Sequence, residues 1–343
     1  MQKLVFMVDD NDYILTLAAS MLESEYDVLT MPSAEKMFSL LEVKHPDLIL
    51  LDIQMPQMSG FDAMKILKQN AAYADIPVIF LTALNDSDNE AYGIELGAVD
   101  FITKPFSKPV LLNRIKNHLH IDKQIRDRTS ELLHLKNGIV YMLADIVESR
   151  DKNTGGHIER TVVYIEILIN AMIEQDVYID ELKRWDFESV VSSSRLHDIG
   201  KVVISDTILN KPGKLTESEF EIMRTHAAEG GTIIDRAIER TGDAEFLYSA
   251  KLFSTFHHEK WDGTGYPNGL KGGEIPLHGR IMAIIDVYDA LVSERSYKKA
   301  FTHEKAVEII TQERGTHFDP LIVDVFEKAS DKIKNACVEL GKS

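Results

Sequence analysis

The chain has 343 residues, of which 44% are hydrophobic, and a formal net charge of -17. This length exceeds the needs of one ordinary core and predicts two domains. The acidic excess is shared along the chain, with -8 in residues 1–120 and -9 in the remainder. Because no basic stripe is present to neutralise phosphates, a nucleic-acid polymer is not an expected partner. The single cysteine, Cys337, excludes an internal disulfide and a cysteine-based metal site.

No apolar run of 18 residues is available to span a membrane. The N-terminus, MQKLVFMVDD, carries acidic residues where an export signal has an apolar segment. We therefore expect no membrane insertion and a cytoplasmic location.

The first 120 residues alternate short apolar runs with amphipathic stretches. The runs KLVFMVDD, DVLTM, LILLDI, PVIFLTA and VDFITKP have the length and composition of buried strands. Helical patterns follow them near 12–24, 33–44, 59–70, 86–96 and 108–120. This alternation predicts an α/β domain with a doubly wound, five-stranded parallel sheet, whose functional residues lie at the carboxyl ends of the strands.

Polar residues stand at the ends of four of these strands. Asp9 and Asp10 follow the first strand, Asp52 ends the third, Thr82 the fourth and Lys104 the fifth. They are expected to converge on one edge of the sheet. Three carboxylates make an oxygen site suited to Mg²⁺, and a hydroxyl and an ammonium beside them can bind a phosphoryl group that is transferred to a carboxylate.

The motifs VDD, LLDIQMPQMSG, LTA and TKP, in this order, make residues 1–120 similar to response-regulator receiver domains. The resemblance implies that Asp52 accepts a phosphoryl group from a cognate sensor histidine kinase. It also implies that Asp9, Asp10, Asp52 and the backbone carbonyl of Gln54 bind Mg²⁺.

Three further positions match the switch residues of that family. Thr82 corresponds to the switch hydroxyl, and Lys104 corresponds to the lysine that pairs with the phosphate. Phe101 occupies the aromatic switch position, although a core residue of the fifth strand would look the same.

After residue 120 the strand signal ends and the sequence is helical in pattern. A seven-residue apolar repeat is formed by Ile125, Leu132, Ile139 and Ile146, with part of a second seam at Leu135 and Met142. The repeat predicts one long helix that joins the domains, and pairing in a homodimer and packing on its own chain both stay open. We assign 121–138 to a linker helix, 139–330 to the second domain and 331–343 to a C-terminal tail.

Two shorter helical signals lie inside the second domain. Thr216 and Glu219 form a capping box that opens a helix toward His226, and a second helix is expected over about 278–293.

Nine of the twelve histidines lie between residues 134 and 317, several of them next to acids. The groups of interest are His157 in TGGHIER, His197 and Asp198 in LHDIGK, His226 in MRTH, His257 and His258 in FHHEKWDG, and Asp286 in IMAIIDVYDAL. Imidazoles and carboxylates without thiolates are ligands for Fe, Mn or Zn. Seven such groups exceed the needs of one ion and favour two ions bridged by Asp198.

Two metal ions favour in-line displacement at phosphorus. Lys201 lies three residues after Asp198, where it can bind a phosphate or assist the leaving oxygen. Taken alone, His157 or His226 is more often a capping or core histidine. Asp286 is a stronger signal, because an ionised carboxylate among apolar neighbours is costly unless a cation pairs with it.

The segments HDIGK and DGTGYP resemble the two signatures of the HD-GYP family, within the HD phosphohydrolase superfamily, over roughly 139–330. The resemblance implies an all-α HD-type domain that hydrolyses cyclic di-GMP to pGpG and, in many members, on to GMP. It implies that Lys201 and Asp198 are catalytic. It also implies two divalent transition metals, Fe or Mn with Zn open, held by His157, His197, Asp198, His226, His257, His258 and Asp286.

The same resemblance points to substrate contacts. Arg295 and Lys298 match positions that contact substrate phosphates, although such a basic pair at a helix end is usually a solvated surface. The loop with Gly265, Tyr266 and Pro267 borders the substrate cleft in the family and is implicated in contacts with diguanylate cyclase (GGDEF) proteins.

One position departs from the pattern of some family members. Asn153 stands four residues before the first histidine ligand, where those members carry a glutamate that helps to hold a third ion. A neutral amide is a weaker ligand for a cation, so we expect two ions.

The sequence thus predicts a two-component response regulator in which phosphorylation at Asp52 modulates hydrolysis of cyclic di-GMP through the long helix. Two alternatives stay open. One is a regulator that binds a cyclic dinucleotide or a partner protein without hydrolysis, and the other is a phosphodiesterase for a related substrate such as cyclic GMP-AMP.

Overall fold

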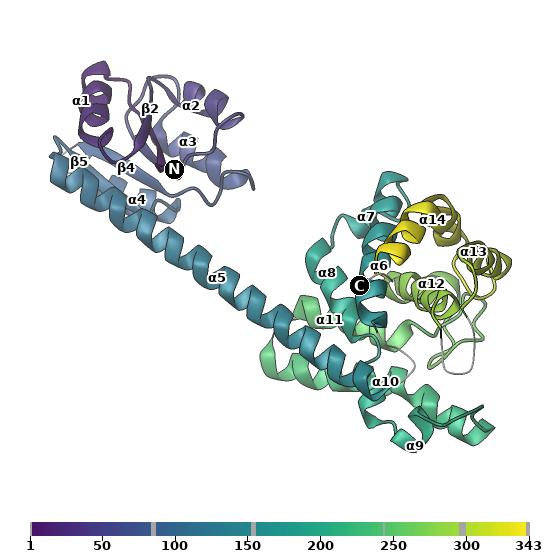
Figure 1. The fold of residues 1–343 in the computed structure, drawn as a ribbon. Coiled ribbons are helices and arrows are strands. Elements are labelled where there is room, and N and C mark those ends of the chain that lie inside the picture. Colours follow the sequence, from purple (N-terminus) through teal and green to yellow (C-terminus); the bar gives the residue numbers. More distant parts are fainter. Residues whose placement is uncertain (1, 84–86, 152–155, 243, 295–299, 341–343) are drawn as a thin grey trace. The chain divides into compact units, whose positions relative to one another are not determined.

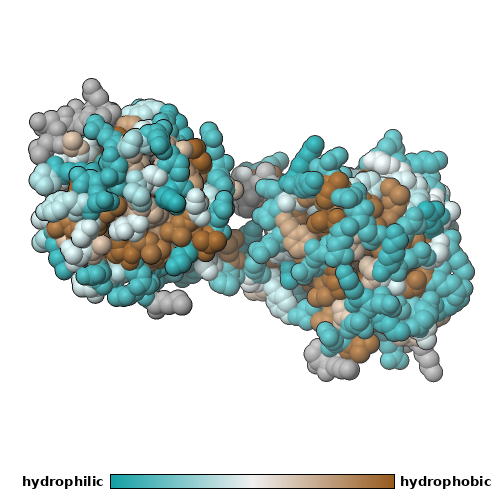
Figure 2. Space-filling model, turned by 90° about the horizontal axis from the view of Figure 1, so that it is seen from above, coloured by the Kyte–Doolittle hydropathy of each residue, from teal (hydrophilic) through white to brown (hydrophobic). Residues whose placement is uncertain are grey.

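The computed structural model describes residues 2–83, 87–151, 156–242, 244–294 and 300–340. The chain forms two compact units, Met1–Leu132 and Leu133–Ser343, and Figure 1 labels most of their helices and strands. Hydrophilic side chains cover most of the visible face of each unit (Figure 2). None of the helices in the described ranges is both long and apolar enough to cross a membrane.

The first unit is built on a five-stranded parallel sheet with the strand order β2-β1-β3-β4-β5. The strands are β1 (Leu4–Val8), β2 (Asp27–Met31), β3 (Leu48–Asp52), β4 (Val78–Ala83) and β5 (Asp100–Lys104). The order reverses at β1, which lies between β2 and β3, so the sheet is doubly wound. The predicted fold class of this domain and its five strands are confirmed.

Helices cover both faces of this sheet. The helices α1 (Asp12–Leu22) and α5 (Lys108–Arg150) share one apolar core with alternate strand residues. The helices α2 (Ala34–Leu41) and α3 (Gly60–Gln69) share the other, and α4 (Ser87–Glu95) follows β4. Because both faces are buried, the strands are continuous apolar runs and do not alternate with polar residues.

Helix α5 runs without a break for 43 residues. The predicted pattern at 108–120 and the predicted linker helix are therefore parts of one helix. Its inner residues Val140, Ala144 and Val147 are buried in the second unit. The residues of the seven-residue repeat are exposed, namely Ile125, Leu132, Leu135, Ile139, Met142 and Ile146.

In its described residues the second unit contains helices and no strand, which confirms the predicted all-α class. Beyond the end of α5 its elements are α6 (His157–Glu174), α7 (Ile179–Leu182), α8 (Phe187–Ser193), η1 (Ser194–Leu196), η2 (Ile199–Val203), α9 (Asp206–Leu209), α10 (Glu217–Thr241), α11 (Ala244–Phe256), η3 (Gly272–Glu274), α12 (Leu277–Val292), α13 (His303–Gln312) and α14 (Pro320–Leu340). The predicted capping box is present, since Thr216 Oγ1 accepts the Glu219 N–H and Glu219 accepts the Thr216 N–H at 2.7 Å. The helix expected over 278–293 is α12.

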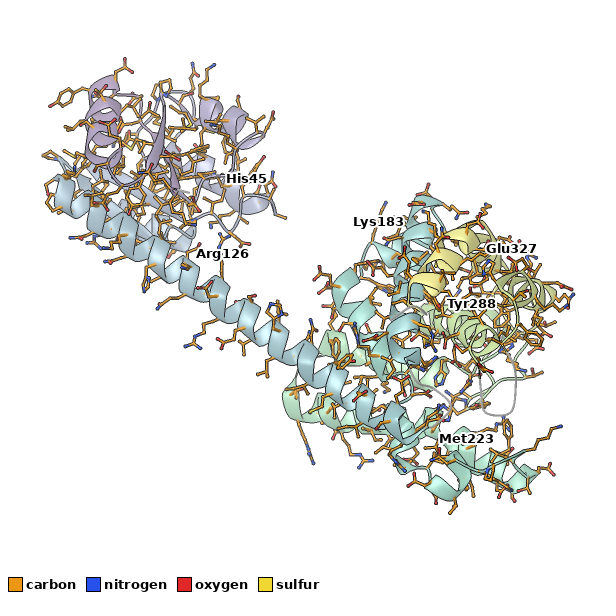
Figure 3. All side chains as sticks on the ribbon, viewed as in Figure 1. His45, Arg126, Lys183, Met223, Tyr288 and Glu327 are labelled. Carbon is orange, nitrogen blue, oxygen red and sulfur yellow. The ribbon has the colours of Figure 1, made fainter. Side chains whose placement is uncertain are left out.

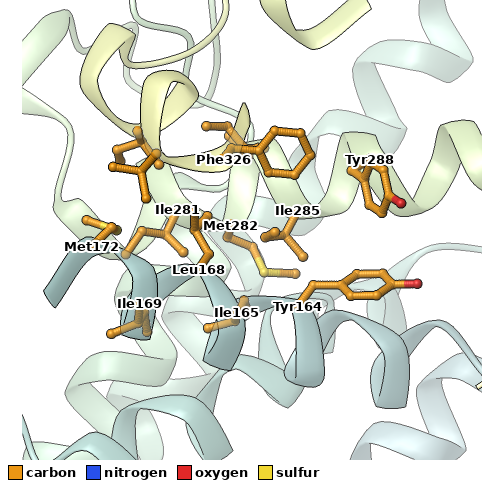
Figure 4. Packing of buried hydrophobic residues seen from close by; sticks show 14 of the residues in the cluster. Tyr164, Ile165, Leu168, Ile169, Met172, Ile281, Met282, Ile285, Tyr288 and Phe326 are labelled. Atoms are coloured by element: carbon orange, nitrogen blue, oxygen red, sulfur yellow. The ribbon is translucent and has the colours of Figure 1, made fainter. Parts of the chain in front are cut away.

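The core of the second unit lies between α6, α12 and α14. Figure 4 shows side chains of α6, among them Tyr164 and Leu168, packed against Ile285 and Tyr288 of α12 and Phe326 of α14. Residues 331–340, which were expected to begin a tail, complete α14, and Ile333 there is fully buried.

Candidate functional sites in the two units

A pocket of about 200 Å³ opens at the carboxyl ends of β1, β3, β4 and β5. It is lined by Asp9, Asp10, Asn11, Ile14, Asp52, Ile53, Gln54, Leu81, Thr82, Ala83 and Lys104. The structure therefore brings together every receiver residue predicted from the strand ends, together with Gln54. Asp9, Asp10 and Asp52 each offer an oxygen within 4.8 Å of the others, which is a donor set that fits Mg²⁺.

Lys104 joins the two buried carboxylates of this pocket. Its Nζ lies 2.6 Å from Asp9 Oδ2 and 2.6 Å from Asp52 Oδ1. Burial raises the pKa of Asp52, although the ion pair with Lys104 opposes the shift. Gly60 allows α3 to begin directly beside this site, because a Cβ at this position would lie 2.2 Å from the Asp52 carbonyl oxygen.

Phe101 lies away from the pocket, in the core of the first unit. Its ring packs 5.6 Å from that of Phe80, and a Cβ on Gly93 would lie 2.6 Å from its Cζ. The structure thus gives Phe101 a packing role between β4 and α4.

In the second unit, the predicted ligands form two groups of three. His157, His197 and Asp198 form one, and His226, His257 and His258 form the other, with ligand atoms within 4.8 Å of one another in each group. They come from the start of α6, the junction of η1 and η2, the middle of α10 and the residues after α11. Four separate parts of the sequence therefore meet at one place.

Four of these histidines are held in a single tautomer by their Nδ1 atoms. The acceptors are Asp289 Oδ2 for His157 at 2.8 Å, Ser194 O for His197 at 3.0 Å, Met223 O for His226 at 2.7 Å (Met223 is labelled in Figure 3) and Ser254 O for His257 at 2.9 Å. A carbonyl or carboxylate oxygen only accepts, so each Nδ1 carries the hydrogen and each Nε2 presents a lone pair.

The Nε2 atoms converge in pairs. His157 Nε2 lies 3.2 Å from His197 Nε2, and His226 Nε2 lies 3.3 Å from His257 Nε2. Nitrogen lone pairs that face one another repel unless a cation binds both. This arrangement, with the other ring nitrogen bonded to an oxygen, is typical of histidines that ligate metals.

Asp198 belongs to the first group and also lies close to the second. Its Oδ2 is 3.4 Å from His197 Nε2, and its Oδ1 is 3.4 Å from His226 Nε2. Asp286 reaches the first group, with Oδ1 at 3.6 Å from His157 Nε2. Both carboxylates thus lie beside the imidazoles, and the mixture of nitrogen and oxygen donors fits metal ions.

The imidazoles of the second group stay neutral. Burial lowers the pKa of His226, of His258 and of His257, the last to about 3, with the neighbouring imidazoles adding to the shift for His257 and His258. Burial also opposes protonation of His197, but the Asp198 carboxylate outweighs it and raises the pKa of that histidine. The neutral form is the one that binds metal.

Lys201 is held between two carboxylates beside this cluster. Its Nζ lies 2.8 Å from Asp198 Oδ2 and 2.9 Å from Asp151 Oδ2. Burial would lower the pKa of Lys201, but Asp198 and Asp151 raise it above its usual value. The lysine is therefore a fixed positive charge next to the metal-binding groups.

Comparison with known proteins matches both units to families. Residues 5–116 match the response regulator receiver domain, and residues 141–322 match the HD domain. A probable cyclic di-GMP phosphodiesterase of Vibrio cholerae serotype O1 is 40% identical over 94% of this chain and 76% of that protein. The cyclic di-GMP phosphodiesterase response regulator RpfG of Xanthomonas campestris pv. campestris is 31% identical over 97% of this chain and 89% of that protein.

The chain belongs to the HD-GYP response regulators. It thus combines a receiver domain with a domain of a metal-dependent hydrolase family, as the motifs predicted. A further relative, named 3'3'-cGAMP-specific phosphodiesterase 2, from Vibrio cholerae, is 40% identical over 57% of this chain and 35% of its own length.

The loop that gives the HD-GYP family its name is held by a buried acid. Glu259 accepts the Asn268 and Leu270 N–H groups at 2.7 and 3.0 Å. Gly265 is needed for close packing, because a Cβ there would lie 2.3 Å from the Lys260 nitrogen. Tyr266 packs its ring 4.7 Å from the ring of His258.

Pro267 follows Tyr266 in a cis peptide bond. Among the other predicted residues, Arg295, Lys298 and Asn153 lie outside the described residues, so the structure says nothing about their contacts.

The sequence analysis missed Asp289 and its partner Arg160. Asp289 is 1% exposed, bonds His157 and accepts from Arg160 Nε at 2.6 Å and Nη2 at 3.0 Å. The sequence contained a signal for Asp289, since it follows Asp286 by three residues in the same apolar helix. Residues at this spacing lie on the same side of a helix, so Asp289 could be expected close to Asp286. Asp151 was also missed, and nothing local in the sequence marks it as the partner of Lys201.

Proposed function

We propose that this chain hydrolyses cyclic di-GMP in its HD domain and that phosphorylation at Asp52 controls the rate. The observation that carries the proposal is the pair of three-ligand groups joined by Asp198, with Lys201 fixed beside them. The names of the relatives from Vibrio cholerae and Xanthomonas campestris support the choice of substrate.

Two divalent transition-metal ions would be held by His157, His197, Asp198, His226, His257, His258 and Asp286. Fe and Mn suit this mixture of nitrogen and oxygen donors, as does Zn. When bound, such ions activate water and polarise the phosphodiester. Asp9, Asp10 and Asp52 would hold Mg²⁺, which would offset negative charge on a phosphoryl group that is transferred to Asp52.

The side chains of the chain itself supply a fixed electrostatic environment. The raised pKa of Lys201 keeps its ammonium charged, so it stabilises negative charge on phosphate oxygens and does not act as a base. Burial opposes ionisation of Asp198, but Lys201 and His197 hold its pKa well below its usual range. Asp198 is thus ionised, and both of its oxygens are available as ligands.

A second substrate is favoured by one comparison. The relative named 3'3'-cGAMP-specific phosphodiesterase 2 is 40% identical over 57% of this chain. Both cyclic dinucleotides present the same phosphodiester to the site and differ in their bases. Binding without hydrolysis is the third outcome to be distinguished.

The experiment that tests the proposed function is incubation with each dinucleotide under anaerobic, reducing conditions with Fe²⁺, Mn²⁺ or Zn²⁺, followed by chromatography. We expect pGpG or GMP from cyclic di-GMP. Turnover of cyclic GMP-AMP alone would favour the second substrate. Binding of either ligand without product in any metal would show a sensor, and the proposal would be wrong.

Regulation is tested at Asp52. A phosphoryl donor, provided in the cell by a sensor histidine kinase, is expected to change the turnover of the wild type and to leave Asp52→Asn unaffected. Asp75→Asn, which changes an exposed aspartate outside the pocket, should behave as the wild type. Equal rates in all three proteins, with and without donor, would contradict control by phosphorylation.

We also propose that the exposed repeat on α5 pairs with the same helix of a second copy. Six apolar side chains at heptad spacing are exposed on one helix, and pairing would remove them from water. In this proposal residues 1–120 form the receiver domain and 121–138 the linker, and the hydrolase domain begins at 139 and continues past 330 to the end of α14 at Leu340.

A further inference from the structure

Arg150, the last residue of α5, binds the segment that carries Lys201. Its Nη1 donates to Val202 O at 2.9 Å, and its Nη2 donates to Ile204 O at 3.0 Å and to Asp206 Oδ1 at 2.8 Å. The side chain of Asn210 donates to the Arg150 carbonyl at 2.8 Å. Carbonyls at the end of a short helix such as η2 have no partners within it, so the guanidinium supplies the donors that they lack.

Gly200 in η2 is packed without space against α10. A Cβ on Gly200 would lie 1.9 Å from the His226 carbonyl oxygen and 2.6 Å from the Gly230 nitrogen. The backbone of η2 is therefore in direct contact with the helix that carries a predicted metal ligand. Its position is set by α10 on one side and by Arg150 on the other.

The neighbours of Arg150 contact two other parts of the site. Glu148 accepts the His157 N–H at 2.6 Å, and Asp151 pairs with Lys201 at 2.9 Å. A narrow pocket lies here, and it is lined by Ala144, Val147, Glu148, Asp151, His157, Ile158, Arg195, Asp198, Ile199 and Lys201. The end of α5 is thus a wall of the site.

We propose that Arg150 is a positioning residue, which ties η2, and with it Asp198 and Lys201, to the last turn of α5. A displacement or rotation of α5 would then reach the reacting groups through these hydrogen bonds. Arg150 acts on backbone carbonyls and on the exposed Asp206, and none of these acceptors belongs to a predicted metal ligand. The forked guanidinium is needed, since a lysine ammonium cannot bind acceptors on two sides in fixed geometry.

The inference rests on the proposed function, because it concerns the rate of hydrolysis and its control from Asp52. The test compares Arg150→Gln and Arg150→Lys with Arg126→Gln. Arg126, labelled in Figure 3, is an exposed arginine of the same helix that pairs with Asp122. We expect kcat to fall about tenfold in Arg150→Gln and less in Arg150→Lys, with KM within about twofold of wild type, because the geometry of reacting groups is disturbed while binding remains. Arg126→Gln should retain the wild-type kcat.

A second readout does not depend on activity. Hydrogen–deuterium exchange of the amides of residues 199–206 is measured in protein free of transition metals but supplied with Mg²⁺ for the receiver carboxylates, with and without beryllofluoride as the phosphoryl analogue. In wild type and Arg126→Gln we expect protection that changes when beryllofluoride binds. In Arg150→Gln the segment should exchange at least about fivefold faster and show no response.

The outcomes separate the two proposals. If the wild type hydrolyses no dinucleotide, the proposed function fails, while the exchange measurement still decides the role of Arg150. If Arg150→Gln keeps wild-type protection of 199–206, or responds to beryllofluoride as the wild type does, the inference is overturned. A segment that never responds in the wild type overturns it as well. Should Arg150→Gln fail to fold, Asp206→Ala removes one acceptor of Arg150 at the surface. It is expected to accelerate exchange of the segment about twofold, and unchanged exchange would refute the inference.

Discussion

Replacement of Asp289 by asparagine isolates the contribution of a buried carboxylate that is not one of the predicted metal ligands. Asp289 Oδ2 accepts from His157 Nδ1 and from Arg160 Nη2, and Oδ1 accepts from Arg160 Nε. All of these partners are donors. Asparagine has nearly the same shape but turns one of the two oxygens into an NH₂ group, so a donor must face a donor. If the amide faces His157, the imidazole proton moves to Nε2 and blocks the lone pair that would bind the metal.

Two magnitudes follow from this geometry. Loss of an outer hydrogen-bond partner of a metal ligand typically costs 10–100-fold in metal affinity, or about 1.4–2.8 kcal/mol. Breaking one partner of a buried ion pair costs about 3 kcal/mol in unfolding free energy, at the lower end of the usual range because 18% of the Arg160 side chain is exposed. Burial by itself would raise the pKa of Asp289, but His157 and Arg160 lower it, so the negative charge is present at neutral pH.

A matched control is available in the same domain. Asp319 is 2% exposed and accepts from Arg280 at 2.9 Å and from the Tyr178 hydroxyl at 2.8 Å, and it has no contact with the predicted ligands. Chemical denaturation should show similar losses of stability for Asp289→Asn and Asp319→Asn. Competition with a chelator should show a loss of metal affinity in Asp289→Asn alone. Equal metal affinity in both variants and the wild type would refute the argument that Asp289 sets the tautomer of His157.

Three further outcomes are expected. Lys201→Gln removes a charge beside the reacting group and should lower kcat by at least about 100-fold. The control Lys251→Gln, at a surface pair with Asp235, should leave kcat unchanged. A retained kcat in Lys201→Gln would contradict the proposed role of this lysine. His278 is buried between Trp185 and Phe253, and its ring nitrogens have no hydrogen-bond partner within the described residues. Burial lowers its pKa to about 4. Between about pH 6.5 and 4 the unfolded state therefore binds a proton on His278 that the folded state does not, so the free energy of unfolding decreases as the pH is lowered through this range. In denaturant titrations of metal-free protein, His278→Phe should remove about 3 kcal/mol of this pH dependence. Equal pH dependence in the variant and the wild type would contradict this expectation. The double variant Leu132→Glu/Ile139→Glu should weaken self-association by at least about 100-fold in analytical ultracentrifugation. The control Val338→Glu, at an exposed apolar residue of α14, should not weaken it. A dimer that neither variant affects would exclude pairing through α5.

The sequence was sufficient where the decisive signals are local. The strands of the first unit are short apolar runs that end in acids, and their order along the chain dictates the edge at which Asp9, Asp52, Thr82 and Lys104 meet. The heptad spacing on α5 is likewise local, and it predicted a long helix. It could not predict that the helix would continue without a break from Lys108, because a pattern of apolar residues does not exclude a turn between two helices.

The sequence could not predict which atom accepts the hydrogen bond from Nδ1 of each metal-binding histidine. For His197 and His226 the Nδ1 acceptor is the carbonyl three residues earlier, and for His257 it is the carbonyl three or four residues earlier, so helical geometry alone supplies the partner. His157 is the first residue of α6, so α6 itself contains no carbonyl three or four residues earlier. Its acceptor must come from another element, and the structure supplies Asp289, 132 residues away on α12. The general consequence is that a metal-binding histidine at the start of a helix requires a distant partner, and a second buried acid in an apolar helix is where to look for it.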